Sequence, residues 1–158
     1  MLEHERQDHT MTLPDGRTLG WAQYGAIDGK PLLYFHGGVS SRLDIEFANS
    51  HCQENNIRLI APDRPGIGIS SPQPKRSLLD WTSDVEHLLN HLNIESLPLL
   101  GWSLAGPYVW ACAYKLPQRF TKISTVGGAS PILPPVKVEQ LGLLADRMLL
   151  SCPPALES

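Results

Sequence analysis

Ser103 lies between a short apolar run at residues 97–101 and a helix-like sequence at 104–116. A serine at a sharp turn from a buried strand into a helix is held above the sheet, where its hydroxyl can attack an acyl carbon. Because such a turn is tight and its backbone strained, its neighbours must be small, and Gly101 and Ala105 meet that need. The spacing predicts nucleophilic chemistry at Ser103, while the simpler interpretation is a serine that caps a helix.

Backbone amides near this serine could stabilise the oxyanion that forms when an acyl carbon is attacked. The amide of Leu104 directly follows the nucleophile, at a helix N-terminus where the first amides lack partners within the helix. A glycine pair follows the apolar run at 31–36, and glycines allow the backbone to approach a substrate closely. We therefore expect Gly38, or else Val39, to supply a second amide, although a glycine pair can also form an ordinary turn.

Histidine is the usual general base for a serine nucleophile. His36 stands beside the glycine pair, where a histidine more commonly organises the loop than acts as a base. His87 and His91 are four residues apart on an expected helix, a spacing that could hold a metal ion. Because no third ligand is apparent, we expect these two histidines on the solvated face of the helix and predict no metal and no cofactor.

The stretch at residues 61–72 carries Pro65, Gly66 and Gly68 after a predicted strand, which could suggest a loop that cradles a phosphate. A dinucleotide-binding fingerprint would open a helix, whereas Ser-Ser-Pro follows here, so this signal is weak. We interpret the stretch as a structural loop in which Asp63 and its neighbour Arg64 form a local ion pair.

Aromatic residues gather around Ser103, namely Trp102, Tyr108 and Trp110. They could line a pocket for an apolar acyl or leaving group. They could equally belong to the core, where aromatic residues near a helix start are more common.

The elements that must position these residues alternate between strands and helices. A hairpin is expected from residue 8 to residue 25, because Pro14, Asp15 and Gly16 separate two strand-like runs. Continuous apolar runs predict buried strands at 31–36, 57–62, 97–101 and 122–128. Apolar periodicity predicts helices at 44–56, 75–94 and 104–116, the second with a capping box of Ser77 and Asp80 and with Leu78 in its apolar stripe. This order predicts an α/β fold with a doubly wound, mostly parallel sheet.

Composition places the chain among globular single domains. It has 158 residues, of which 42% are hydrophobic and 18% charged, and its formal net charge is -3. Neither that charge nor any cluster of basic residues indicates nucleic acid or a membrane surface as a partner. The spacing of Cys52, Cys112 and Cys152 fits neither a disulfide framework nor a zinc site. With a polar N-terminus and no apolar segment of membrane-spanning length, we expect a cytoplasmic protein.

Three motifs together, YFHGGVSSRLD, LIAPDRPGIGISSP and LLGWSLAGPY, resemble the α/β-hydrolase superfamily of the proline-iminopeptidase-like and esterase-like type. The resemblance runs from about residue 8 to residue 130. It implies that Ser103 is the nucleophile, that Gly38 and Leu104 supply the oxyanion hole, and that Asp63 to Ser70 form a structural loop beside the site. Ala105 departs from the glycine that the family usually has there.

In this family the acid and then the histidine of the triad follow the serine. After Ser103 there is no histidine, and the later carboxylates are Glu139, Asp146 and Glu157. The resemblance therefore implies the N-terminal half of a hydrolase, truncated after about the sixth strand, with residues 1–133 as core and 134–158 as the start of a cap or lid. Residues 134–150 would be the cap fragment, in which 138–150 look helical.

A serine hydrolase acting on an ester, amide or peptide-type acyl bond of a small molecule is the preferred hypothesis. A non-catalytic binding or interaction protein is the alternative, because the base is missing. In either case a second copy or a complementary chain is expected to cover the exposed sheet edge.

Overall fold

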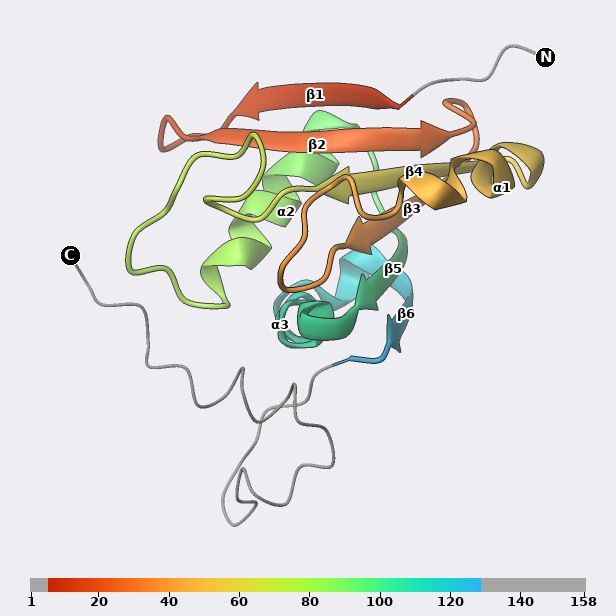
Figure 1. Cartoon of the computed structure of the whole chain (residues 1–158). Helices are drawn as coiled ribbons and strands as arrows, with labels where there is room; N and C mark the ends of the chain where they lie inside the picture. The colour runs from red at the N-terminus through yellow and green to blue at the C-terminus, as the bar shows by residue number, and fades with distance from the viewer. Residues whose placement is uncertain (1–5, 129–158) are drawn as a thin grey trace.

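The computed structural model describes residues 6–128, in which six strands form one sheet with the order β1-β2-β4-β3-β5-β6 (Figure 1). The strands are β1 (Gln7–Thr12), β2 (Thr18–Gly25), β3 (Lys30–Phe35), β4 (Ile57–Pro62), β5 (Leu97–Trp102) and β6 (Phe120–Val126). The helices are α1 (Asn49–Glu54), α2 (Asp80–His91) and α3 (Gly106–Lys115), with short 3-10 turns η1 (Glu46–Ala48), η2 (Ser103–Ala105) and η3 (Pro117–Arg119). The predicted alternation of strands and helices is confirmed.

The expected hairpin is present, with β1 and β2 paired in antiparallel fashion. In its turn the amide of Gly16 donates to the carbonyl of Leu13 at 2.9 Å, and Gly16 adopts a positive φ of 85°, which suits glycine. β2 also runs antiparallel to β4, whereas β3 pairs in parallel with β4 and β5, and β5 in parallel with β6. The sheet is therefore mostly parallel, as predicted.

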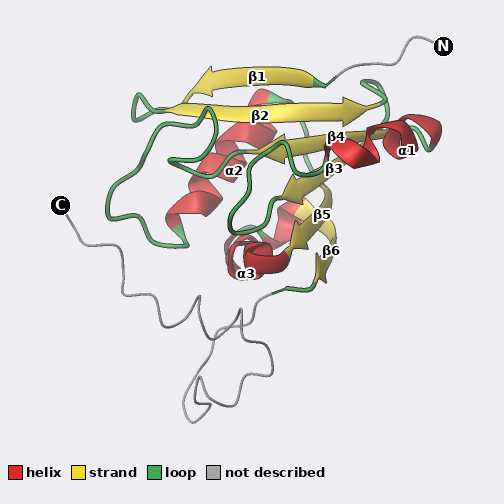
Figure 2. Ribbon diagram, viewed as in Figure 1, coloured by secondary structure: helices red, strands yellow, loops and turns green. Residues whose placement is uncertain are grey.

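Helices cover both faces of this sheet (Figure 2). α2 and α3 pack on one face, over a core in which Leu33, Phe35 and Trp81 are at most 1% exposed. The rings of Phe35 and Trp81 meet edge to face with their centroids 5.5 Å apart. α1 packs on the other face against β2 and β4 and buries Cys52. Because the central strands are buried on both faces, their sequences are continuous apolar runs rather than alternating ones.

Some predicted boundaries differ from the structure. The helix expected over 44–56 is shorter, because η1 comes first and α1 begins only at Asn49. Leu78 was expected in the apolar stripe of the helix over 75–94, but it precedes α2 and is 44% exposed. The strand expected at 122–128 runs from 120 to 126, because Gly127 has a φ of 55° and leaves the strand conformation. The cap segment predicted over 134–150 lies outside the described residues.

The capping box at the start of α2 is confirmed by its hydrogen bonds. The amide of Ser77 donates to the Asp80 carboxylate at 2.6 Å, and the amide of Asp80 donates to the Ser77 hydroxyl at 3.3 Å. These reciprocal bonds satisfy backbone donors that a helix start leaves free. The box therefore fixes where the chain turns into α2, after the loop that follows β4.

The outer edge of β6 has no strand partner among residues 6–128. β6 pairs only on its inner side, with β5, and Val126 near its end is 58% exposed. An unpaired edge of this kind presents free backbone donors and acceptors to any chain that can pair with it.

Within the same described part of the chain, no helix is long and apolar enough to cross a membrane.

Candidate active site

The backbone at Ser103 is strained. Ser103 follows β5 directly, opens η2, and has a φ of 54°, in the left-handed region that non-glycine residues rarely adopt. Asn56 and Asn93 have the same φ, but asparagine tolerates this region better than serine does. Such strain costs free energy and is concentrated at functional sites. The sharp turn predicted from the sequence is therefore present at Ser103.

The residues next to this turn must be small for a reason visible in the packing. A Cβ atom placed on Gly101 would lie 2.4 Å from Cγ2 of Val109 and 3.1 Å from Cβ of Ala105, so no larger residue fits there without rearrangement. Ala105 itself has a φ of -69°, an ordinary helical value. An alanine is therefore accommodated without strain at the position where the family usually has glycine.

The structure brings the predicted oxyanion residues to this turn. A Cβ atom placed on Gly37 would lie 3.8 Å from Cβ of Ser103, and one placed on Gly38 would lie 2.2 Å from Cδ1 of Leu104. The glycine loop thus lies against the turn on both sides of the serine. Within residues 6–128 the amide of Gly38 makes no hydrogen bond. Val39, the alternative donor, has a side chain that is 97% exposed.

Asp44 holds the glycine loop in place, a role that the sequence did not reveal. One of its carboxylate oxygens accepts hydrogen bonds from the amide of Gly37 at 3.2 Å and from the hydroxyl of Ser40 at 2.6 Å. These bonds commit the Gly37 amide to the loop itself. Gly38 is therefore the glycine of the pair whose amide has no partner among residues 6–128.

Arg64 stabilises the same loop through hydrogen bonds of its guanidinium. Its guanidinium donates to the carbonyl of His36 at 2.6 Å and to the carbonyl of Gly37, and it lies over the Tyr108 ring, 4.9 Å from the centroid. Only 5% of Arg64 is exposed, and burial lowers the pKa of its guanidinium. Arg76 donates to the hydroxyl of Tyr108 at 3.2 Å. Tyr108 therefore belongs to the support of the loop.

The predicted ion pair between Asp63 and Arg64 is wrong. Asp63 is fully buried and pairs instead with Arg42. The guanidinium of Arg42 lies 3.0 Å from one carboxylate oxygen of Asp63, and the backbone amide of Arg42 donates to the other oxygen at 2.7 Å. Successive residues at the end of a strand point to opposite sides, so Asp63 and Arg64 face different partners. The amide of Ile69 also donates to Asp63, at 3.0 Å, within the loop after β4. The bonds between Asp63 and Arg42 then tie that loop to the loop after β3.

His36 is a structural residue of the loop. Its Nδ1 lies 2.9 Å from the carbonyl oxygen of Gly37, and its Nε2 accepts the amide of Arg64 at 3.4 Å. Burial, and then the nearby Arg64 guanidinium, lowers the pKa of His36 to about 4. Because both ring nitrogens are engaged, neither is left to accept the proton of Ser103. The interpretation of His36 as a loop-organising residue rather than a base is confirmed.

The buried imidazole of His36 should make stability depend on pH. In the unfolded chain His36 takes up a proton as pH falls below about 6.5, but in the folded chain it stays neutral down to about 4. The unfolded state therefore binds more protons in this window, and the free energy of unfolding should drop by about 3 kcal/mol between pH 7 and pH 4. Urea unfolding at several pH values measures this slope.

A matched pair of variants isolates the contribution of His36. His36→Gln should flatten the pH dependence in that window, whereas His51→Gln, at an exposed position on α1, should keep it. An unchanged slope in His36→Gln would show that another group controls the acid sensitivity.

The remaining candidate side chains, Trp110, His87 and His91, are all at least partly exposed. Trp110 is 56% exposed, so it does not belong to the core. His91 is exposed and meets the ring of Trp21 edge to face with centroids 5.7 Å apart, while His87 is half-buried. No group of three metal-ligating side chains occurs in the part of the chain that the structure describes.

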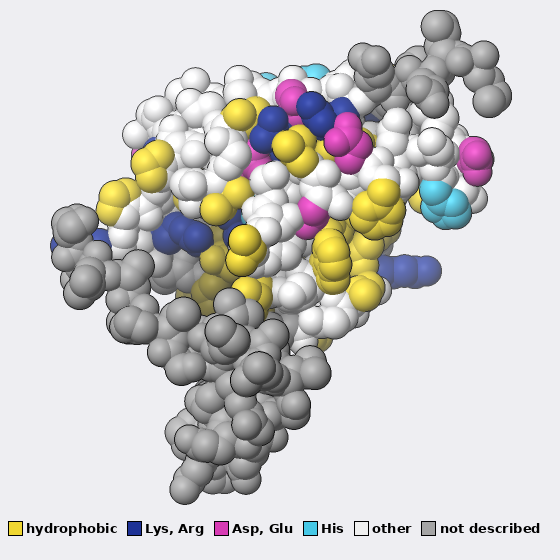
Figure 3. Space-filling view, in the orientation of Figure 1, with side chains coloured by type: hydrophobic (Ala, Val, Ile, Leu, Met, Phe, Trp, Pro, Cys, Tyr) yellow, Lys and Arg dark blue, Asp and Glu magenta, His cyan; other side chains and the backbone are white. Residues whose placement is uncertain are grey.

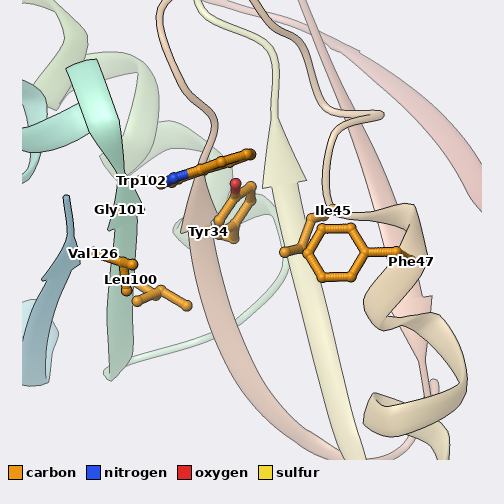
Figure 4. Close-up of a pocket in the computed structure, with 7 residues that line it drawn as sticks. All are labelled: Tyr34, Ile45, Phe47, Leu100, Gly101, Trp102 and Val126. Atoms are coloured by element: carbon orange, nitrogen blue, oxygen red, sulfur yellow. The ribbon is translucent and has the colours of Figure 1, made fainter. Parts of the chain in front are cut away.

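Trp102 lines an apolar pocket next to the turn, as one of the two interpretations predicted. The pocket has a volume of about 300 Å³ and is lined by Tyr34, Ile45, Phe47, Leu100, Gly101, Trp102 and Val126 (Figure 4). Apolar side chains also gather on the surface in the view of Figure 3, and large exposed apolar residues of this region include Phe47 at 79% and Trp102 at 44% exposure. The pocket therefore lies beside the end of β5 and is open to the surface.

Comparisons with known proteins agree on one family. Residues 30–152 match the family model described as alpha/beta hydrolase fold. The chain is 33% identical over 120 residues to the uncharacterized hydrolase YcgS of Bacillus subtilis, covering 76% of this chain and 41% of YcgS. It is 30% identical over 105 residues to a probable proline iminopeptidase of Leptolyngbya boryana, covering 65% of this chain and 32% of that protein.

A solved structure of a hydrolase from Pseudomonas aeruginosa superposes with a TM-score of 0.74. At 22% identity, with 81% of this chain and 48% of that one covered, it shows the fold. The chain spans less than half the length of each of these three proteins.

Proposed function

The chain belongs to the alpha/beta hydrolase fold family, and on that premise we propose that Ser103 is the nucleophile of a serine hydrolase. Its substrate is a small molecule with an ester, amide or peptide-type acyl bond. The observation that carries the proposal is the left-handed backbone of Ser103, held between Gly101 and the start of α3. A serine that only capped a helix would have no need of this strain.

The proposed reaction follows from the groups around the serine. The hydroxyl oxygen of Ser103 attacks the carbonyl carbon, and the amides of Gly38 and Leu104 donate to the oxyanion that forms. The leaving group departs with a proton, and water then hydrolyses the acyl-enzyme. Because His36 is engaged and no histidine follows Ser103, we propose that the acid and base of the triad come from outside this sequence.

Covalent labelling by a fluorophosphonate, read by intact mass, tests the assignment. Labelling that disappears in Ser103→Ala supports Ser103 as the nucleophile. Labelling that persists in the variant contradicts it.

A second candidate function is that of a non-catalytic binding protein built on the same fold. The engaged nitrogens of His36 favour it, because they leave the imidazole beside the glycine loop unavailable as a base for Ser103. A folded chain that binds acyl compounds but resists the fluorophosphonate would support this candidate over the first.

We propose that a second copy or a complementary chain covers the outer edge of β6. Its backbone edge is unpaired within residues 6–128, and such an edge offers free donors and acceptors to another strand. Light scattering should then give a mass above that of one chain. Val126→Asp should lower this mass, because a charge on an edge strand opposes pairing.

Ile27→Asp serves as the control for the edge, because Ile27 is 43% exposed but lies in the turn after β2. It should leave the mass unchanged. A monomer in the unsubstituted chain would exclude the second copy and leave a complementary chain as the proposed partner.

A cytoplasmic location is proposed as well. Cys52 and Cys112 are buried free thiols, which a reducing compartment preserves.

A further inference from the structure

One face of the sheet is only partly covered by helices. Neighbouring residues of a strand point to opposite faces, and Leu97 and Leu99 of β5 pack in the core beside α2 and α3. Leu100 and Trp102 therefore point to the other face, on which α1 lies. Of the described elements, η1 and α1 cover that face, and they pack against β2 and β4. Within residues 6–128, β5 and β6 are thus left without a helix on the α1 side.

The uncovered part of this face is an apolar hollow. Val126 of β6 stands opposite Trp102 in the strand register and so shares its face. In Figure 4 these two residues and Leu100 line one side of the hollow, while Ile45 and Phe47 line the other. Phe47 is 79% exposed, Val126 58% and Trp102 44%. Since parallel strands are normally buried on both faces and a contiguous exposed apolar surface marks a site of association, we expect another element to pack here.

The hollow indicates which kind of element would fit. Its walls carry no charged side chain, so a charged group would lose its hydration there without compensation. At about 30 Å³ for each water-sized group, a leucine or methionine side chain of four such groups occupies about 120 Å³, and the volume of about 300 Å³ admits about two of them. β5 is about 20 Å long, which a helix of about 13 residues matches. An amphipathic helix of that length is therefore the expected occupant.

The chain has a sequence of this kind after β6. Residues 138–150 read VEQLGLLADRMLL and stand between Pro135 and Pro153. Polar residues at 139, 140, 146 and 147 gather on one side of a helix with this sequence. Apolar residues three or four apart form a stripe on the other side, namely Val138, Leu141, Leu144, Ala145, Met148 and Leu149.

This segment is tethered within reach of the hollow. Val126, the last residue of β6, lines the hollow itself. Residues 127–137 separate Val126 from the segment and can span about 36 Å when extended. A short flexible tether gives an effective concentration of about a millimolar, so a contact too weak to join separate chains is sufficient here. A second copy of the chain lacks this advantage.

We propose that residues 138–150 form a helix that packs its apolar stripe on the α1 side of β3, β5 and β6, over the hollow in Figure 4. The predicted cap fragment would then lie on the face of the sheet beside Ser103. There it completes the helical layer that α1 begins. The contact is separate from the unpaired outer edge of β6, and it does not depend on the chemistry at Ser103.

Hydroxyl-radical footprinting of the full chain, read for each residue by mass spectrometry, tests this docking. Phe47 and Tyr114 have nearly equal exposures within the described residues, 79% and 77%, but Tyr114 lies on α3, across the sheet. Each oxidation rate is divided by the rate of the same residue in the urea-unfolded chain. On this scale Phe47 should react at least about threefold more slowly than Tyr114, because a tethered segment shields it in most molecules.

Two leucines of the segment provide a matched pair of variants. Leu141 lies at the centre of the apolar stripe, whereas Leu143 falls among the polar residues. Leu141→Asp should remove the protection of Phe47 and raise the oxidation rate of Trp102, because a charge in the apolar contact weakens it by more than about tenfold. Leu143→Asp should leave both rates unchanged. Leu141→Ala should give a smaller rise in the same direction.

Trp81 reports on folding in the same experiment, because it is fully buried in the core and should stay unreactive in every folded variant. If Trp81 becomes reactive in Leu141→Asp, the comparison is made with Leu141→Ala.

The outcomes decide between occupants of the face. Equal rates for Phe47 and Tyr114 in the unsubstituted chain would overturn the docking, as would protection that survives the change at Leu141. Protection that falls on dilution would assign the face to a second copy and overturn it too. Protection that is independent of protein concentration and lost only with Leu141 would uphold it, whether or not a fluorophosphonate labels Ser103.

Discussion

A fluorophosphonate should modify the chain at Ser103 and at no other serine, and Ser103→Ala should abolish the modification. Ser103 lies at the strained turn that opens η2, where we expect the amides of Leu104 and Gly38 to stabilise charge on the phosphoryl oxygen. Ser124→Ala, at an exposed position on β6, should leave labelling unchanged. Intact mass after a fixed incubation distinguishes the outcomes.

The rate of this labelling carries further information. Without a histidine to remove its proton, the hydroxyl of Ser103 is a weak nucleophile, and loss of one triad member typically costs about four orders of magnitude in rate. We therefore expect slow labelling whose rate keeps rising with pH, as the alkoxide becomes more abundant. A plateau near neutral pH would instead show that a histidine from another chain activates Ser103, and equal labelling of Ser103→Ala would exclude the nucleophile assignment.

Much of the fold can be predicted from the sequence because its local signals agree with its tertiary contacts. β3 and β4 are buried on both faces, so their apolar runs identify them without knowledge of their neighbours. The turn at Ser103 is also a local property, because a buried strand, small residues and a helix start follow one another directly. The fold and the turn at Ser103 were predictable for the same reason.

Contacts between distant residues were not predictable in this way. Asp63 has Arg64 as its neighbour in sequence but binds Arg42, which is 21 residues away. The direction of the two side chains depends on how the strand ends, and no local pattern encodes it. The role of Asp44 is hidden for a similar reason, because its bonds to Gly37 and Ser40 require the loop to fold back on itself. One cue was present, namely a carboxylate a few residues after a glycine pair.

The resulting network of buried charge should be the most sensitive part of the chain. Asp63→Ala should lower the free energy of unfolding by about 3–5 kcal/mol, because the variant leaves Arg42 buried with one partner fewer. It also removes the acceptor for the amides of Arg42 and Ile69. Urea unfolding measures the change, and Asp28→Ala, at an exposed turn, should alter stability by no more than about 0.5 kcal/mol.

A double-mutant cycle shows whether the loss comes from the pair or from the carboxylate alone. Nε of Arg42 also donates to the carboxylate of Asp8 at 2.8 Å, so the Arg42 charge keeps one partner in Asp63→Ala. Gly68 packs directly against the Asp63 carboxylate, because a Cβ atom placed on Gly68 would lie 2.0 Å from Oδ2 of Asp63. If Arg42→Met and Asp63→Ala together cost clearly less than the sum of the two changes, the ion pair couples the loops after β3 and β4. Strictly additive losses would mean that Asp63 acts through the backbone amides alone, and the glycine loop beside Ser103 would then not depend on the pair.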